Sequence, residues 1–233
     1  YLPVSSMTKY IFLSEKPWHD HIYECLSKRE GESWFRIKQK NDFNEALLKE
    51  LKPELIFIPH WSYIIPESIW QNFTCIVFHM TDLPFGRGGS PLQNLIVMGH
   101  KETMISALQV DQGIDTGDIY CKSLLSLKGS AQDIFERSAP IIAKMIEKII
   151  EEQLSPIPQQ GAPVLFKRRK EEDGKLNQLS TLTEVYNYIR MLDAEGYPSA
   201  FVETEHFVIK FKEAKFCNAS NSEIQANVII TKK

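Results

Sequence analysis

The sequence lacks a long apolar run. No segment of its 233 residues approaches the roughly 20 apolar residues that a membrane-spanning helix needs, so we expect no such helix and no membrane partner. The first residues, YLPVSSM, contain no basic stretch followed by an apolar one, so a secretory signal is not expected there. We expect Met7 to be the natural initiator and residues 1–6 not to be native.

The chain also lacks an excess of positive charge. Its 27 lysines and arginines are outnumbered by 30 aspartates and glutamates, which gives a net charge of −3. Nucleic-acid binders usually carry a basic field, because neutralising phosphates supplies much of their affinity. The basic run at residues 167–170 is followed at once by the acidic residues 171–173. We therefore expect no nucleic-acid partner.

Cysteine is scarce and scattered. The four cysteines form no Cys-x-x-Cys pair, a spacing that fits neither a zinc site nor a small disulfide framework. We expect reduced thiols in a cytoplasmic protein, and no metal.

Apolar runs of strand length alternate with stretches of helical spacing. Strands are expected over 9–13, 33–37, 55–58, 74–78, 102–110 and 119–127, and helices over 19–28, 41–51, 66–71, 91–98 and 130–152. Asn41 or Asp42 is expected to cap the second helix, and Ser130 the last. Alternation of this kind predicts an α/β fold with a largely parallel sheet flanked by helices.

The character changes at Leu154–Pro163, which holds three prolines and a glycine and reads as a linker or crossing segment. A helix over 183–192 and strands over 201–203, 207–211 and 228–231 are expected beyond it. We predict a main domain at 8–155, and a linker with a small C-terminal α+β region at 156–233.

Two polar side chains stand where apolar runs end. His79 follows the predicted strand 74–78 and precedes a glycine-rich loop, and Asp115 lies between two glycines in DQGIDTG. A histidine at a strand end can stabilise an oxyanion or move a proton near neutral pH. The alternatives are a packed histidine and a plain surface turn. The strand end and the arrival of an acid on a second loop favour a functional pair, in which the carboxylate would favour the charged imidazolium.

Basic residues offer candidate substrate contacts. Arg87, in the glycine-rich loop, could clamp a substrate phosphate or pin its own loop, and pinning is favoured. Lys167, Arg168 and Arg169 could neutralise a diphosphate or simply form a solvated surface. The glycine cluster is not a P-loop, because no Gly-Lys-Ser/Thr follows it.

The segments HMTDLPFGRGGSP (79–91) and DQGIDTGD (111–118) resemble the signature of enzymes that transfer formyl groups from N10-formyltetrahydrofolate to amines. That signature reads Asn-x-His, Leu-Pro-x-x-Arg-Gly-x-x-Pro and Asp-x-Gly-x-Asp-Thr-Gly. The resemblance implies a Rossmann-like sheet, a folate co-substrate, no metal, and catalytic roles for His79 and Asp115. His79 would stabilise the tetrahedral oxyanion, while Asp115 would orient the imidazole and receive the amine proton.

The resemblance also implies a folate pocket. Its walls would be Tyr63, Ile64 and Ile65 on one side of the pterin, and on the other the loop from Asp111 through Gly113 to Asp115.

One position departs from the signature. Val77 stands where the family has an asparagine that holds the formyl oxygen, and valine cannot donate. Losing one oxyanion donor typically costs ~2.7–4 kcal/mol. We expect a substitute donor, with Asn94, Thr81 and backbone N–H groups as the candidates.

The downstream segments FKRRKEEDG (166–174) and GYPSAF (196–201) resemble the sugar-nucleotide N-formyltransferase branch. Within this branch, the sequence around His79 is most similar to one subgroup. That subgroup formylates a UDP-linked 4-amino-4,6-dideoxy-2-acetamido sugar of the pseudaminic acid pathway in bacteria. This implies a UDP-linked amino sugar as partner, and a monomer or homodimer. The alternatives are formylation of methionyl-tRNA or of glycinamide ribonucleotide, and a folate or nucleotide-sugar binding protein without activity.

Overall fold

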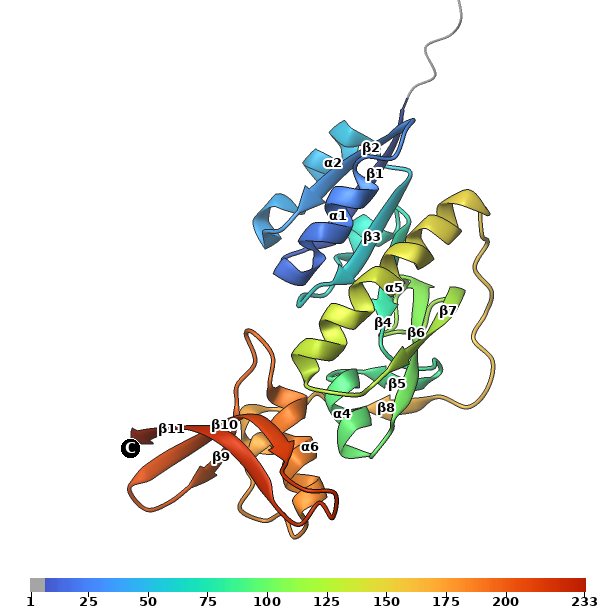
Figure 1. Ribbon diagram of the computed structural model, residues 1–233. Coiled ribbons are helices and arrows are strands. Elements are labelled where there is room, and N and C mark those ends of the chain that lie inside the picture. Colours follow the sequence, from blue (N-terminus) through green and yellow to red (C-terminus); the bar gives the residue numbers. More distant parts are fainter. Residues whose placement is uncertain (1–6) are drawn as a thin grey trace, which may run out of the picture. The chain divides into compact units, whose positions relative to one another are not determined.

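The computed structural model describes residues 7–233 (Figure 1). Residues 1–6 lie outside the described part, so the expectation that they are not native is untested. The chain forms two compact units that interleave along the sequence. The first holds residues up to 87 with 104–124 and 136–164, and the second holds 88–103, 125–135 and 165–233. The division of the sequence at 155/156 stays a prediction.

A six-stranded sheet with the order β2-β1-β3-β4-β6-β7 organises the first unit. Its strands are β1 (Thr8–Ser14), β2 (Glu32–Ile37), β3 (Leu55–His60), β4 (Cys75–His79), β6 (Glu102–Gln109) and β7 (Ile119–Ser126). The pairs β1–β2, β1–β3 and β3–β4 are parallel, whereas β4–β6 is antiparallel. The predicted α/β class with a mostly parallel, Rossmann-like sheet is confirmed. Strand β2 pairs with β1 on one side and β3 pairs with it on the other, so the chain passes from β2 across β1 to reach β3.

Helices cover both faces of this sheet. Those of the first unit are α1 (Asp20–Leu26), α2 (Glu45–Leu51), α3 (Glu67–Trp70) and most of α5 (Ala131–Glu151). On one face Leu48 of α2 and Ile69 of α3 join the core cluster that contains Ile11 and Ile56. The alternate strand residues point to the other face, where Phe12 meets Tyr23 of α1. Buried residues on both faces explain why the strands read as continuous apolar runs.

Helix α5 lies on the same side of the sheet as α1 (Figure 1). Arg29, just beyond α1, pairs with Glu147 and Glu151 of α5 at 3.7 and 3.0 Å.

Capping explains where two helices begin. Ser130 Oγ accepts the Asp133 amide at 3.1 Å, so the predicted cap of α5 is confirmed. The predicted cap of α2 is wrong, because Asn44 accepts the Leu47 amide at 3.1 Å and holds the cap position. Residues Lys40–Asp42 form a separate 3-10 turn before it. Asn41 and Asp42 are therefore used by a turn that helical periodicity does not distinguish from a first helical turn.

The second unit contains α4 (Pro91–Val97), α6 (Leu182–Leu192) and a three-stranded antiparallel sheet, ordered β11-β10-β9. Its strands are β9 (Ala200–Glu203), β10 (Phe207–Phe216) and β11 (Ile224–Lys232). A capping box between Thr181 and Glu184 begins α6. The predicted C-terminal region, a helix followed by strands, is confirmed, although β10 and β11 are longer than expected.

Short elements complete the chain. They are β5 (Phe85–Gly88) and β8 (Val164–Phe166), which pair as a two-stranded sheet, and the 3-10 turns Pro17–His19 and Glu171–Gly174. Within residues 7–233, no helix combines the length and apolar character needed to cross a bilayer.

Candidate active site

His79 is the last residue of β4 and is buried. Its Nε2 lies 2.8 Å from the carbonyl oxygen of Gly86. Because a carbonyl only accepts, Nε2 in this arrangement carries the hydrogen, and in the neutral ring Nδ1 holds the lone pair. The turn that returns this carbonyl to the ring depends on Gly86, whose φ of +78° lies in the left-handed region. The loop thus fixes both the ring plane and its tautomer.

Asp115 meets the other ring nitrogen. Its Oδ2 lies 3.6 Å from Nδ1 of His79, with the side chains 18% and 9% exposed. The structure therefore brings together the two residues that sequence analysis paired across 36 positions. An imidazole fixed by a carbonyl at one nitrogen and facing a carboxylate at the other can hold or release a proton at Nδ1.

The backbone of Asp115 is strained, with φ at +55°. This region is uncommon for a residue with a Cβ and costs of order 1–3 kcal/mol. The loop around it is tight, since a Cβ on Gly117 would lie 1.7 Å from the Gln109 carbonyl oxygen. Such strain persists only where the surroundings enforce it, and it clusters at functional sites.

Asp111 builds the loop from within. Its Oδ1 accepts the Gly113 amide at 3.0 Å and the Thr116 hydroxyl at 2.5 Å. The Asp111 carboxylate thereby serves as an internal brace. The contacts predicted for Asp111 and Gly113 with the folate stay predictions.

A relay of side chains holds the same loop from outside. Arg87 donates to Gln159 Oε1 from Nε and Nη2 at 3.1 and 2.8 Å. Gln159 Nε2 donates in turn to the carbonyls of Asp115 and Gly117 at 2.9 and 2.8 Å. Pinning, the favoured role for Arg87, is what the structure displays, and its contact with substrate stays a prediction. Gln159 carries no signal in the sequence, because nothing distinguishes one glutamine in a proline-rich segment.

The predicted pterin wall follows β3. Ile64 is 88% exposed and Tyr63 is 43% exposed. Ile65 instead joins the core cluster beside the sheet, so it can offer a ligand only its backbone. On the opposite loop Ile114 is 69% exposed. The two exposed isoleucines and the backbone of these loops suit a flat, partly apolar ring, and their contact with it stays a prediction.

Val77 has no direct replacement among the candidate side chains. Thr81 is buried and donates to the Gly86 carbonyl at 3.3 Å. In the second unit, Asn94 donates both amide hydrogens, to the carbonyls of Gly89 and Lys167 at 3.1 and 3.0 Å. Either residue would have to break a bond to serve an oxyanion. Their proposed role stays a prediction, and backbone N–H groups are the candidate left without that cost.

The basic run divides into two kinds of residue. Arg169 is used within the second unit: its Nη2 donates to the Asp173 carbonyl at 3.1 Å and its guanidinium lies 5.4 Å from the centre of the Tyr188 ring. Lys167 and Arg168 are exposed. These two are therefore better placed to meet an anion, and substrate contact by all three stays a prediction.

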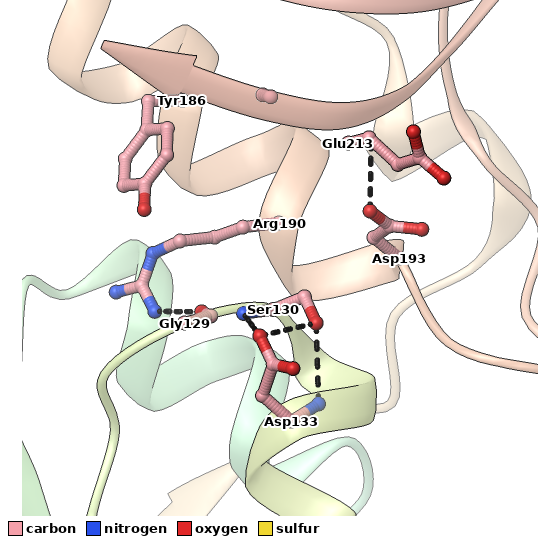
Figure 2. Close-up of a pocket in the computed structure, with 8 residues that line it drawn as sticks. Gly129, Ser130, Asp133, Tyr186, Arg190, Asp193 and Glu213 are labelled. Carbon is pink, nitrogen blue, oxygen red and sulfur yellow. Dashed lines mark hydrogen bonds between the residues drawn. The ribbon is translucent and has the colours of Figure 1, made fainter.

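A pocket of about 370 Å³ lies within the second unit (Figure 2). Arg190 at its wall donates to the carbonyls of Leu127 and Gly129 at 2.7 and 2.9 Å. Asp193 accepts the backbone amide of Glu213 at 2.8 Å. The groups that line this pocket mainly satisfy one another, and none of the catalytic or binding residues predicted from the sequence lines it.

Two further histidines lie at the carboxyl ends of β1 and β3. Burial lowers the pKa of His60 to about 4, and burial together with His60 and Arg36 lowers that of His19 to about 3. His60 packs edge-on against Trp18. No group of three or more potential ligands within residues 7–233 is placed to hold a metal.

Known proteins resemble this chain along most of its length. The family model described as formyl transferase matches residues 15–134, and the model for the C-terminal domain of methionyl-tRNA formyltransferase matches residues 171–231. A structure of methionyl-tRNA formyltransferase from Clostridium thermocellum is 43% identical, with a TM-score of 0.93, and the match covers 97% of this chain and 100% of that one.

More distant relatives also match most of this chain. Methionyl-tRNA formyltransferase from Rickettsia felis is 26% identical over 83% of this chain, which spans 65% of that relative's length. A sugar N-formyltransferase from a Shewanella species is 15% identical with a TM-score of 0.64, covering 85% of this chain and 94% of that one, which shows the fold alone. The expected membership of the sugar-nucleotide branch is therefore not confirmed. The proteins with higher sequence identity to this chain are named methionyl-tRNA formyltransferase.

Proposed function

Since the chain belongs to the formyl transferase family, we propose that it transfers a formyl group from N10-formyltetrahydrofolate to an amine. The observation that carries the proposal is the pairing of His79 Nδ1 with Asp115 Oδ2 at 3.6 Å, at the end of a strand in the matched region. An acyl transfer needs a group to bear the oxyanion and a group to take the amine proton.

The residues fit this donor. Exposed Ile64 and Ile114 offer apolar surface, and the strained loop offers backbone groups to a ring. The folate, when bound, supplies an activated formyl group. The Gly86 carbonyl holds His79 through Nε2–H, so Nδ1–H of the protonated ring is the hydrogen available to a developing oxyanion. Asp115 would stabilise the positive charge of the protonated imidazole and take the proton that the attacking nitrogen loses, directly or through water. The carbon–N10 bond would then break, N10 would take up a proton, and tetrahydrofolate would leave.

Methionyl-tRNA is the acceptor that we propose first. This proposal rests on the match of residues 171–231 to the model for the C-terminal domain of methionyl-tRNA formyltransferase, and on the names of the similar proteins. The exposed pair Lys167 and Arg168 would then meet RNA phosphates. On this proposal, the sequence-based expectation of no nucleic-acid partner is wrong.

An amino group of a UDP-linked sugar is the second acceptor that we propose, and charge favours it. Residues 165–233 hold 11 lysines and arginines against 10 aspartates and glutamates, and the whole chain carries −3. A domain that holds tRNA through phosphates normally carries a clear positive excess. A diphosphate is far smaller than a tRNA, and a few charge-assisted hydrogen bonds can hold it.

One experiment separates the acceptors. The protein is incubated with N10-formyltetrahydrofolate and either charged methionyl-tRNA or a panel of UDP- and dTDP-linked amino sugars, and the products are analysed by mass spectrometry. Formylation of methionyl-tRNA supports the first proposal, and a formylated sugar supports the second. If the donor is consumed with no acceptor formylated, both acceptor proposals are wrong. The His79→Asn protein serves as the control for uncatalysed transfer.

A further inference from the structure

We infer that Gln159 is a positioning residue for the reaction: its carboxamide holds Asp115 in the strained conformation that aims the carboxylate at His79. This inference rests on the proposed function, since it assigns a role to the loop that carries Asp115. The residue comes from the segment between α5 and β8, which the sequence presents as a linker.

The carboxamide binds the loop at two points. Gln159 Nε2 donates one bond to the carbonyl oxygen of Asp115 and one to that of Gly117, at 2.9 and 2.8 Å. These carbonyls lie on either side of Thr116, so the two bonds fix the path of the chain on both sides of it. Both hydrogens of the amide are used. A left-handed φ at Asp115 is thereby over-determined from outside, as a strained residue requires.

Arg87 decides which way the amide faces. A guanidinium has no acceptor, so the group that meets Arg87 Nε and Nη2 at 3.1 and 2.8 Å must be the amide oxygen. The NH₂ end must then point at the loop. The arginine therefore selects the one orientation of Gln159 that can hold Asp115.

The segment that carries Gln159 is itself anchored. Ile157 pairs with Ile119, the first residue of β7, through two backbone hydrogen bonds of 2.8 and 3.0 Å. The Val164 amide donates to the Pro84 carbonyl at 3.1 Å. Gln159 lies between these two fixed points, so the backbone that presents it to the loop is held at both ends.

The sharpest variant is Gln159→Glu. It keeps the size of the side chain and its contacts with Arg87, but it turns an oxygen toward two carbonyls and so removes both donors to the loop. Misplacing a reacting group by about 1 Å can lower turnover by about 100-fold. We expect kcat to fall by about 10- to 100-fold, with KM for N10-formyltetrahydrofolate changed by less than about threefold. The neighbouring exposed Gln160→Ala protein is the matched control and should retain wild-type kcat.

A double-mutant cycle shows whether the effect passes through Asp115. In the Asp115→Asn background, Gln159→Glu should lower the residual rate by less than about twofold, because the carboxylate that it positions is gone. Arg87→Lys provides a second route if Gln159→Glu does not fold. It keeps the charge but cannot hold the amide oxygen at two points, so kcat should again fall, and again not in the Asp115→Asn background.

Two results would overturn the inference. One is a Gln159→Glu protein that turns over like wild type. The other is an equal loss in both backgrounds, which would mean that Gln159 supports the fold and not Asp115. Failure of the proposed function looks different, because the wild-type protein would then transfer no formyl group at all.

Discussion

Asp115 combines a functional carboxylate with a strained backbone, and substitutions can separate the two. Asparagine keeps the size of the side chain and tolerates the left-handed region, so Asp115→Asn removes only the charge. Alanine removes the charge and tolerates this region less well. A Cβ in left-handed geometry costs roughly 1–2 kcal/mol, and aspartate or asparagine can recover part of this through local hydrogen bonds. Glycine has no Cβ and accommodates φ +55° readily.

The expected stabilities and activities therefore diverge. We expect Asp115→Asn to unfold within about 0.5 kcal/mol of wild type and Asp115→Ala to be less stable by about 1 kcal/mol. In a chain of this size, 1 kcal/mol lowers Tm by about 2–4 °C. We expect Asp115→Gly to be at least as stable as Asp115→Ala. All three should lose about 10²- to 10⁴-fold in kcat, the range for a proton-transfer group.

Calorimetry and a formyl-transfer assay with the preferred acceptor measure the two effects. If Asp115→Asn retains kcat within about threefold of wild type, well short of the loss expected for a proton-transfer group, the carboxylate does not transfer the proton. If Asp115→Ala is as stable as Asp115→Asn, the left-handed backbone at Asp115 costs no measurable stability.

Three further predictions concern buried or partly buried groups. The pKa values of His19 and His60 are lowered to about 3 and 4 in the folded protein. Just below pH 6.5 only the unfolded chain therefore binds protons at these two histidines. As the pH falls from about 6.5 toward these lowered pKa values, each histidine should lower the free energy of unfolding by up to about 1.4 kcal/mol per pH unit. Urea unfolding at pH 7 and pH 5 measures this, and equal stability at both would contradict it. Cys75 is 1% exposed, and burial raises its pKa to about 12. A thiol reagent at pH 7.5 should therefore label exposed Cys25 and leave Cys75 unlabelled until the protein unfolds. Rapid labelling of Cys75 in the native protein would be inconsistent with this burial. Val77 packs against both apolar clusters beside the sheet, so Val77→Asn should restore the family's residue yet destabilise the fold by about 1–3 kcal/mol; a variant as stable as wild type would show that the amide finds a partner there.

The sequence predicted the sheet well because its strands are buried on both faces and read as continuous apolar runs. The end of β4 at His79 followed from the same signal, and its pairing with Asp115 followed from family resemblance and strand-end placement together. The cap of α2 was misassigned, because Asn41, Asp42 and Asn44 are all good capping residues and only the fold chooses among them.

The side-chain hydrogen bonds that hold the loops around the site could not be predicted from the sequence. The bonds from Gln159 to the Asp115 loop join residues more than 40 positions apart, and a glutamine carries no periodic or motif signal. The commitment of Asn94 to the carbonyls of Gly89 and Lys167 was equally hidden. Contacts of one side chain with distant backbone depend on how loops fold back, which the local sequence does not encode.

The most direct test of the central claim follows the formyl carbon itself. The protein is mixed in excess with N10-formyltetrahydrofolate labelled at the formyl carbon, in the presence of methionyl-tRNA or an amino-sugar nucleotide. We predict that the label appears on an acceptor amine, one for each tetrahydrofolate released, and that Asp115→Asn slows this single turnover by at least about 100-fold. Label that stays on the folate or leaves as free formate, at equal rates with both proteins, would contradict the account.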